Sequence, residues 1–303
     1  MAGIITTGNH PKAMWPGVKA FFGRQYDEHS EEFPDLFDMG TSDKAYEEYV
    51  ELTGFGLAAV IDQGAPVQYD SESQGYITRI TNVAYALGFI VTRQELDDNQ
   101  YEIVGKRRAK VLAFSARQTK ETILANIYNR AQTTGYTGGD GVVLLSTAHP
   151  TKNGTQANKM SSDADISEAA LEDLSILIMN ATNSRGMKIN LIPQSLHVPP
   201  ALWYEAHRIL KSVQQNDTAN NATNALKLLN VFPKGIKLNR YLSDTDAYFI
   251  RTNVPDGMVF QQRIPYEFTQ DNDFDTMNAK AKYYERFAGG WGDWRALYGS
   301  MGG

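Results

Sequence analysis

Residues 93–131 read RQELDDNQYEIVGKRRAKVLAFSARQTKETILANIYNRA, and this stretch decides the fold. It contains no proline, and Gly105 is its one glycine. Small or apolar side chains recur at steps of three and four residues, which is the spacing of one helical face: Leu112, Ala116, Thr119, Ile123, Ile127 and Ala131. The pattern predicts one helix of about 40 residues, about 60 Å long at 1.5 Å per residue, with Gly105 as the place where it would divide.

Charge is distributed unevenly along this predicted helix. Acidic residues lie early, at Glu95, Asp97, Asp98 and Glu102, and basic residues lie later, which suits the helix macrodipole. The strongest basic run consists of Lys106, Arg107, Arg108 and Lys110. Two interpretations stay open: a solvated helix face paired with carboxylates, or a contact surface for an acidic partner.

The residues before the helix, 53–92, have the composition of extended structure. Phe55–Ile61 is predicted as a strand, with turns at residues 63–66 and 70–75. Residues 76–91 are rich in β-branched and aromatic types, which favour strands. We expect a long hairpin or a pair of hairpins, long enough to protrude as a loop.

Residues 1–50 carry many aromatic side chains, including Trp15, Phe21 and Phe22, between scattered prolines. A polar disordered tail would not hold so many aromatics. The segment is either an arm that packs on another molecule or an ordinary N-terminal subdomain.

The C-terminal half mixes short helices and strands, which gives the α+β class. Residues 142–145 are predicted as a strand, and 167–182 as a helix capped by Asp165 or Ser167. A strand over 188–198 leads into a helix that Pro199 and Pro200 begin, and the chain from about Val231 is mostly extended.

Composition excludes several classes of function. The chain of 303 residues has no cysteine, which rules out disulfides and thiolate chemistry. Its net charge of −6 argues against sequence-specific binding of nucleic acid, since such proteins are usually basic. The first residues lack the basic and apolar regions of a signal peptide, and no apolar run approaches membrane-spanning length.

No motif for catalysis, cofactor binding or metal binding is convincing. The five histidines are dispersed, and the zinc-protease, nucleophile-elbow and Walker motifs are missing. Residues 135–141 (GYTGGDG) resemble a phosphate cradle, but a phosphate site needs a helix to begin after the glycines. Residues 271–275 (DNDFD) begin like a calcium loop without its Gly and Glu positions. We therefore expect a protein that is not an enzyme and has no cofactor.

Two stretches carry a resemblance to a known family. They are LHVPPALWYEAHRIL, residues 196–210, and the tail from FIRTNVPDG (249–257) through DFDT (273–276) to RFAGGWGDWRALYG (286–299). Together with Gly54–Gly56 and the order of predicted elements, they resemble major capsid proteins of tailed bacteriophages with the Hong Kong 97-like fold. Within that fold the chain is most similar to the Mu-type major head subunits.

The resemblance implies a division of the chain. Residues 1–52 would be an N-terminal arm, and 53–92 an extended loop lying over a neighbouring subunit. Residues 93–160 and 255–303 would form a peripheral domain with the long helix as its spine. Residues 161–254 would form an axial domain, whose polar segment 214–224 would meet its copies at the symmetry axes.

The resemblance also implies function and partners. The chain would assemble with itself as pentamers and hexamers into an icosahedral virion shell, built in the host bacterial cytoplasm around double-stranded DNA. Portal, scaffolding and decoration proteins would be its other partners, and no membrane is involved. Lys106, Arg107, Arg108 and Lys110 would then face DNA or a neighbouring subunit. Other candidates for inter-subunit contact are Trp15, Phe21, Phe22, Phe55, Tyr69, Tyr76 and Arg79.

Two alternatives remain at the level of the sequence. One is an encapsulin-like compartment shell of the same fold, which encloses protein cargo. The other is a hydrolase or nucleotide-binding enzyme that uses residues 135–141, against which the dispersed histidines argue.

The composition of the predicted loop yields a test. Some members of the fold crosslink a loop lysine to an asparagine of a neighbour, but this chain has no lysine between Lys44 and Lys106. We expect particles boiled in detergent to release subunits that run as monomers on a denaturing gel. A ladder of covalent multimers would contradict this expectation.

Overall fold

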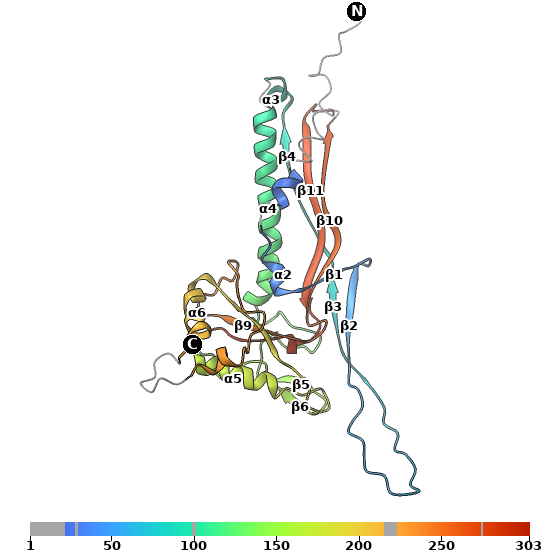
Figure 1. Ribbon diagram of the computed structural model, residues 1–303. Coiled ribbons are helices and arrows are strands. Elements are labelled where there is room, and N and C mark those ends of the chain that lie inside the picture. The colour runs from blue at the N-terminus through green and yellow to red at the C-terminus, as the bar shows by residue number, and fades with distance from the viewer. Residues whose placement is uncertain (1–21, 28–29, 99–100, 215–222, 274) are drawn as a thin grey trace, which may run out of the picture.

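A computed structural model describes residues 22–27, 30–98, 101–214, 223–273 and 275–303. A long helix runs beside a long sheet, a second mixed unit lies at one end, and a loop projects beyond that end (Figure 1). The arrangement belongs to the α+β class, as the sequence predicts.

The long helix is present but is interrupted at a different place. Helix α3 (Arg93–Asp97) ends in a turn at Asp98, and helix α4 (Tyr101–Asn129) continues for 29 residues, about 43 Å. Gly105 lies inside α4 and does not divide it. The buried face also differs from the predicted stripe, because Thr119 is exposed whereas Lys120, Leu124 and Tyr128 are buried.

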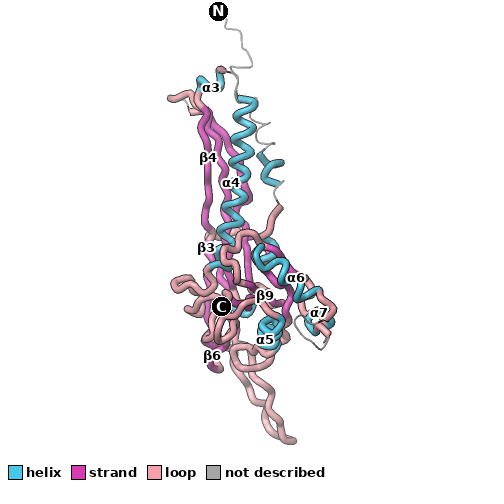
Figure 2. Tube along the Cα trace, turned by 90° about the vertical axis from the view of Figure 1, so that its left-hand side faces the viewer, coloured by secondary structure: helices cyan, strands magenta, loops and turns pink. Residues whose placement is uncertain are grey.

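Helix α4 lies against a four-stranded sheet in the order β1-β10-β11-β4 (Figure 2). Its strands are β1 (Asp38–Thr41), β10 (Met258–Asn272), β11 (Ala279–Trp291) and β4 (Val83–Val91). Burial alternates along β11, with Ala281 and Tyr283 buried and Lys280 and Lys282 exposed. One face of the sheet therefore meets α4. The opposite face exposes Lys280 and Lys282, and at its other end Val259 and Ala288 pack against Ile80 of β3 (Gln74–Thr81).

A buried ion pair sits between α4 and the sheet. The Lys120 ammonium lies 2.7 Å from Glu285 Oε1, and both side chains are almost inaccessible. Glu285 also accepts hydrogen bonds from the Tyr26 and Tyr283 hydroxyls and from Gln262. These donors replace the water that the carboxylate loses on burial, which makes burial of the charge tolerable.

Helix α4 also holds the short helix α2 (Phe33–Leu36). The N-cap residue of α2, Glu32, provides no side-chain cap. The Glu121 carboxylate instead accepts hydrogen bonds from the backbone N–H groups of Glu32 and Phe33, at 2.9 and 3.0 Å. Burial raises the pKa of Glu121 to about 7. The N-terminal segment is thus fixed to the long helix by an interaction that no local sequence pattern predicts.

The second unit is built on the sheet β12-β9-β7-β8. Ser167 caps helix α5 (Glu168–Met179) by accepting a hydrogen bond from the Ala170 N–H, as predicted, although the helix ends at Met179. Strand β7 (Pro193–Val198) leads through a turn that starts at Pro200 into helix α6 (Trp203–Lys211), also as predicted. Leu171, Leu174 and Ile178 of α5 pack with Leu196 and Val198 of β7 in one core.

The remaining elements of the described chain are short or belong to the hairpins. Their bounds are β2 (Tyr46–Leu52), β3 (Gln74–Thr81), β5 (His149–Thr151), β6 (Gly154–Gln156), η2 (Pro200–Leu202), α7 (Ala225–Leu228), β8 (Ile236–Leu238), β9 (Tyr248–Thr252), η3 (Trp294–Ala296) and β12 (Leu297–Ser300). Strands β2 and β3 pair antiparallel and are joined by residues 53–73, here called the extended loop.

Two predicted strands are wrong. Phe55–Ile61 is not a strand but part of the extended loop, since its backbone has no partner strand among the described residues. Residues 142–145 make only an isolated bridge between Val143 and Thr137. In both places apolar composition suggested a strand, but strand pairing depends on a partner that local composition does not specify.

The buried ion pair gives a test of the fold. Replacing Lys120 with Met leaves the buried Glu285 carboxylate without its cation, and we expect a loss of about 3–5 kcal/mol of unfolding free energy. Lys110→Met, an exposed position on the same helix, should change it by less than about 0.5 kcal/mol. Denaturant unfolding of the unassembled chain measures both, and equal effects would show that the pair is not the anchor described.

Candidate inter-subunit surfaces

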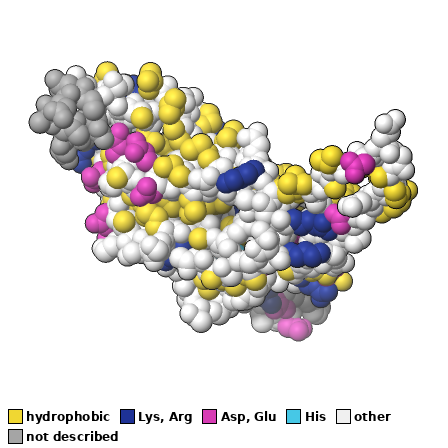
Figure 3. Space-filling view, turned by 90° about the horizontal axis from the view of Figure 1, so that it is seen from below, with side chains coloured by type: hydrophobic (Ala, Val, Ile, Leu, Met, Phe, Trp, Pro, Cys, Tyr) yellow, Lys and Arg dark blue, Asp and Glu magenta, His cyan; other side chains and the backbone are white. Residues whose placement is uncertain are grey.

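The extended loop exposes apolar side chains that its own chain does not cover. Val60 is 97% exposed, Tyr69 96% and Leu57 87%, with Phe55 and Val67 also largely exposed. Figure 3 shows hydrophobic side chains on the part that projects from the body. Apolar residues gathered on a projecting loop are typical of an interaction site, because their exposure to water is unfavourable.

Hydrogen bonds across the loop hold it in shape. At its base, the Thr53 N–H donates to the Ser73 carbonyl at 3.1 Å, and the Ser73 N–H donates back to Thr53 Oγ1. Further out, the Gly56 N–H donates to the Asp70 carboxylate at 2.7 Å. This bond, with those from the Ser71 N–H and from Arg185, lowers the pKa of Asp70.

One arginine of the second unit connects the loop to the body. The Arg185 guanidinium donates to Asp70 Oδ2 and to the Ser71 carbonyl, each at 2.5 Å. The Lys152 ammonium donates to Ser73 Oγ at 3.0 Å beside it. Lys and Arg side chains accordingly lie next to the projecting part in Figure 3. The loop is therefore oriented by the body and not only by its own hairpin.

The glycine-rich residues 135–141 pack against strand β3. The Gly139 N–H donates to Thr78 Oγ1 at 3.2 Å, and a side chain at Gly139 would lie 2.5 Å from the Ile77 carbonyl. The Gly138 and Gly141 N–H groups donate to the Val142 and Gly138 carbonyls. These amides are committed to protein acceptors, and no helix follows the glycines, so the segment is a packing loop and not a phosphate cradle.

A groove lies between α4 and strand β4. It encloses about 540 Å³ and is lined by Leu87, Phe89, Val111 and Leu112, with Arg107 and Arg108 at its rim. Strand β4 is an edge strand with the sequence VAYALGFIV, which contains no charge and no proline. Such an edge lacks the features that usually prevent pairing with another strand.

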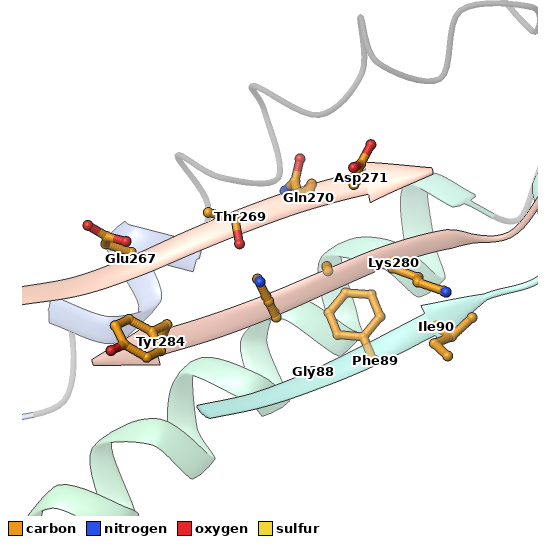
Figure 4. Close-up of a pocket in the computed structure, with 11 residues that line it drawn as sticks. Gly88, Phe89, Ile90, Glu267, Thr269, Gln270, Asp271, Lys280 and Tyr284 are labelled. Atoms are coloured by element: carbon orange, nitrogen blue, oxygen red, sulfur yellow. The ribbon is translucent and has the colours of Figure 1, made fainter. Parts of the chain in front are cut away.

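The other face of the same sheet is polar. Figure 4 shows Glu267, Thr269 and Asp271 on β10 beside Lys280 and Tyr284 on β11. The hollow over these strands encloses about 800 Å³. Lys280 pairs with Asp273 at 2.5 Å, which lowers the pKa of Asp273. Acidic and basic side chains alternate on this surface. It therefore differs from the groove, which is apolar and has only basic residues at its rim.

The structure sorts the candidates for inter-subunit contact. Phe55 and Tyr69 are exposed on the extended loop, and Arg79 is exposed but pairs with Glu48 of its own hairpin at 2.6 Å. Tyr76 is partly buried at the loop base. Phe22 is fully buried, with its ring 4.6 Å from that of Phe268, which removes it from the candidates. Trp15 and Phe21 lie outside the described residues.

The basic run divides in the same way. Arg108 lies 2.8 Å from Glu95 of its own chain, as the solvated-face interpretation expects. Arg107 and Lys110 are exposed, and no carboxylate of the described residues lies within ion-pair distance of either side chain. The side chain of Lys106 lies outside the described part of the chain.

One histidine pairs with a carboxylate, but the pair is inaccessible. His149 Nδ1 lies 2.6 Å from Asp140 Oδ2, and Nε2 lies 3.1 Å from Asn158 Oδ1. The ring is fully buried and stacks on Trp294 at 4.2 Å. Because both nitrogens are engaged and no solvent reaches them, this pair cannot exchange a proton with a substrate. It fixes the loop 135–141 to the body.

The described residues offer neither a metal site nor a membrane-spanning helix. Within these residues, no three His, Cys, Asp or Glu side chains gather as metal ligands would. In the same part of the chain, no helix is both long and apolar enough to cross a membrane.

The family follows from the sequence profile. Residues 76–300 match the family described as phage capsid protein, which covers most of the chain. The chain belongs to this family. It is a structural protein of the capsid and not an enzyme. No curated protein sequence matches it.

Solved capsid structures share its fold at low sequence identity. The capsid of an empty GTA particle matches with a TM-score of 0.55 at 10% identity, over 99% of this chain and 91% of that one. A Mycobacterium phage Adephagia structure matches at 0.53 and 12%, over 99% of both chains. A virus-like particle from Pyrococcus furiosus matches at 0.53 and 12%, over 95% and 99%. The capsid protein thus has the Hong Kong 97-like fold, and its closeness to the Mu type stays a prediction.

Sequence reasoning missed several residues of these surfaces. Composition predicts a strand at Leu57 and Val60, although the two nearby glycines and the polar turns favour a loop. Arg185 and the groove residue Val111 carry no local signal, since each acquires its role from a segment far away in sequence.

Arg185 provides a test of how the loop is oriented. Arg185→Ala removes the charged hydrogen bonds to Asp70 and Ser71, each of which is solvent-exposed. An exposed ion pair contributes up to about 1 kcal/mol, so amide exchange within residues 53–73 should accelerate about two- to fivefold. Hydrogen–deuterium exchange on the unassembled capsid protein measures this. Arg107→Ala, which removes an arginine that does not contact the loop of its own chain, is the matched control. Unchanged amide exchange in Arg185→Ala would show that Arg185 does not hold the extended loop.

Proposed function

We propose that this capsid protein is the repeating subunit of an icosahedral tailed-phage shell, assembled from pentamers and hexamers of itself in the host cytoplasm. The projecting apolar loop supports this proposal, because the exposure of its apolar side chains to water is unfavourable in an isolated chain. The enclosed double-stranded DNA and the portal, scaffolding and decoration proteins belong to the same proposal. The chain's acidic balance suits a wall that encloses DNA without gripping it.

We further propose the division into an arm (1–52), a loop segment (53–92) that includes the extended loop and strands β3 and β4, a peripheral domain (93–160 and 255–303) and an axial domain (161–254). The separate core of α5, α6 and β7 supports an axial unit of its own. The pairing of β2 with β3 supports ending the arm before Tyr46 instead of at residue 52. The segment 214–224, proposed as an axial contact, lies mostly outside the described residues.

The extended loop of one copy is proposed to dock on the α4–β4 groove of the next. The two surfaces lie toward opposite ends of the molecule, so the loop does not cover its own groove (Figure 1). A contact between two different surfaces of one chain is heterologous, and it closes into rings when the rotation permits. Such a contact is therefore suited to building pentamers and hexamers.

Apolar character and charge both support this pairing. The loop contributes Leu57, Val60 and Tyr69, and the groove contributes Leu87 and Val111. The loop contains the acids Asp62, Asp70 and Glu72 and no basic residue. Arg185 already binds Asp70, which leaves Asp62 and Glu72 to meet Arg107 and Lys110 of the neighbour. The uncharged edge of β4 can in addition accept a strand.

Assembly of the purified protein tests the function and the contact together. Electron microscopy of wild-type particles should show uniform icosahedral shells, and a monomer that turns over a substrate would refute the proposal. Arg107→Glu places an acid against the acidic loop and should reduce shell yield severalfold. Normal yield from Arg107→Glu would reject the loop–groove contact while leaving the shell function intact.

Two further variants sharpen this experiment. Lys282→Glu makes the same charge change on the other face of the sheet and should leave the yield near that of wild type. Adding Asp62→Lys to Arg107→Glu restores opposite charges and should recover part of the yield. Nucleic acid inside shells from infected cells indicates a virion, whereas an enclosed enzyme indicates the compartment alternative.

A further inference from the structure

A second charged cavity lies at the junction between the N-terminal segment and the second unit. It encloses about 390 Å³ and is lined by Asp35 and Asp38 on one side and by Lys234, Lys237 and Arg251 on the other. Ser195 also lines it, from strand β7. Neither the loop–groove contact nor the shell function uses these residues.

One of the three basic side chains in the cavity, Lys234, is not part of an ion pair among the described residues. Lys237 lies 2.9 Å from Asp35, and Arg251 Nη2 lies 2.9 Å from Asp38. The Lys234 ammonium has no ion pair or hydrogen bond with any described residue. Three cations thus face two carboxylates, and the charge difference matches one negative charge from a ligand.

A donor buried in the wall of the cavity is also unpartnered. Arg251 is only 8% exposed, and its Nε–H has no acceptor among the described residues. A buried guanidinium N–H without an acceptor costs free energy, and a bound oxyanion would supply the acceptor. The planar guanidinium is suited to this because its remaining donors already hold Asp38 and the Asp35 carbonyl.

Behind the cavity, the protonation state of His197 determines whether the Ser195 hydroxyl can donate a hydrogen bond to a ligand. Burial, followed by the nearby charges of Arg251, Lys237 and Lys234, lowers the pKa of His197 to about 3, so the ring is neutral. Its Nδ1 has no partner, whereas Nε2 lies 2.8 Å from Ser195 Oγ. A buried N–H without an acceptor costs more than a buried ring nitrogen without a donor, so the single proton is assigned to Nε2, which donates to Ser195 Oγ. The Ser195 hydroxyl hydrogen remains available to a ligand in the cavity.

We propose that this cavity binds a phosphate oxyanion through the Lys234 ammonium, the Arg251 Nε–H and the Ser195 hydroxyl. A cation, a guanidinium donor and a hydroxyl form a donor set that suits the oxygens of a phosphate group. The shared chemistry covers two sources, inorganic phosphate from solution and the phosphodiester backbone of DNA. The site joins residues of two units, since Asp35 and Asp38 precede the long helix and the cations belong to the second unit.

Calorimetric titration of the full chain with inorganic phosphate at constant ionic strength tests the proposal. Wild type should bind one phosphate saturably, and Lys234→Ala and Ser195→Ala should each weaken binding tenfold or more. Arg251→Lys keeps the charge but removes Nε, and it should also weaken binding tenfold. Lys211→Ala, on helix α6 outside the cavity, should bind as wild type does.

The outcomes are separable. Absence of saturable binding to wild type, or equal affinity in Lys234→Ala and wild type, would overturn the proposal. Circular dichroism melting shows whether each variant is folded, and Lys234 is exposed enough for its variant to fold. Short duplex DNA added as a competitor identifies the source: displacement of phosphate indicates a backbone phosphate, and retention indicates phosphate from solution. Shell formation is not required for any of these measurements.

Discussion

The burial of helix α4 against one face of the sheet β10–β11–β4 is the contact on which the other parts of the molecule depend. Leu112, Ala116 and Leu124 exclude water there, and the Lys120–Glu285 pair fixes the helix at one position along the strands. Glu121, the next residue of the helix, then holds helix α2. Because α4, β10 and β11 are all long, one layer of packed side chains joins them along most of their length.

A spine of this form leaves surfaces that the chain cannot cover alone. Only one face of the sheet is used by α4, strand β4 remains an open edge, and the extended loop projects beyond the body. In a monomeric protein these features would favour aggregation. We propose that in this capsid protein they direct assembly, because the projecting apolar loop of one copy can cover the apolar groove of another.

Much of the fold could be predicted from local patterns. The Ser167 cap, the helix that follows Pro200 and the strand-rich C-terminus appear where the sequence places them, and the long helix appears with its interruption before Tyr101 instead of at Gly105. The errors have a common cause. The stripe on α4 was drawn through Thr119, because a period of three to four residues does not reveal that Lys120 is the buried neighbour. Lys120 is buried only because Glu285, far along the chain, compensates its charge.

The sequence by itself therefore determined the class of fold, the absence of cysteine and of loop lysines, and the resemblance to phage capsid proteins. These depend on composition, periodicity and motif, which are local properties. Only the tertiary structure decided that Phe22 is internal, that Arg185 orients the loop, and that Lys234, Arg251 and Ser195 line one cavity. Each of these facts joins residues distant in sequence. Ser195 and Arg251, for example, meet as paired residues of strands β7 and β9 in the second unit.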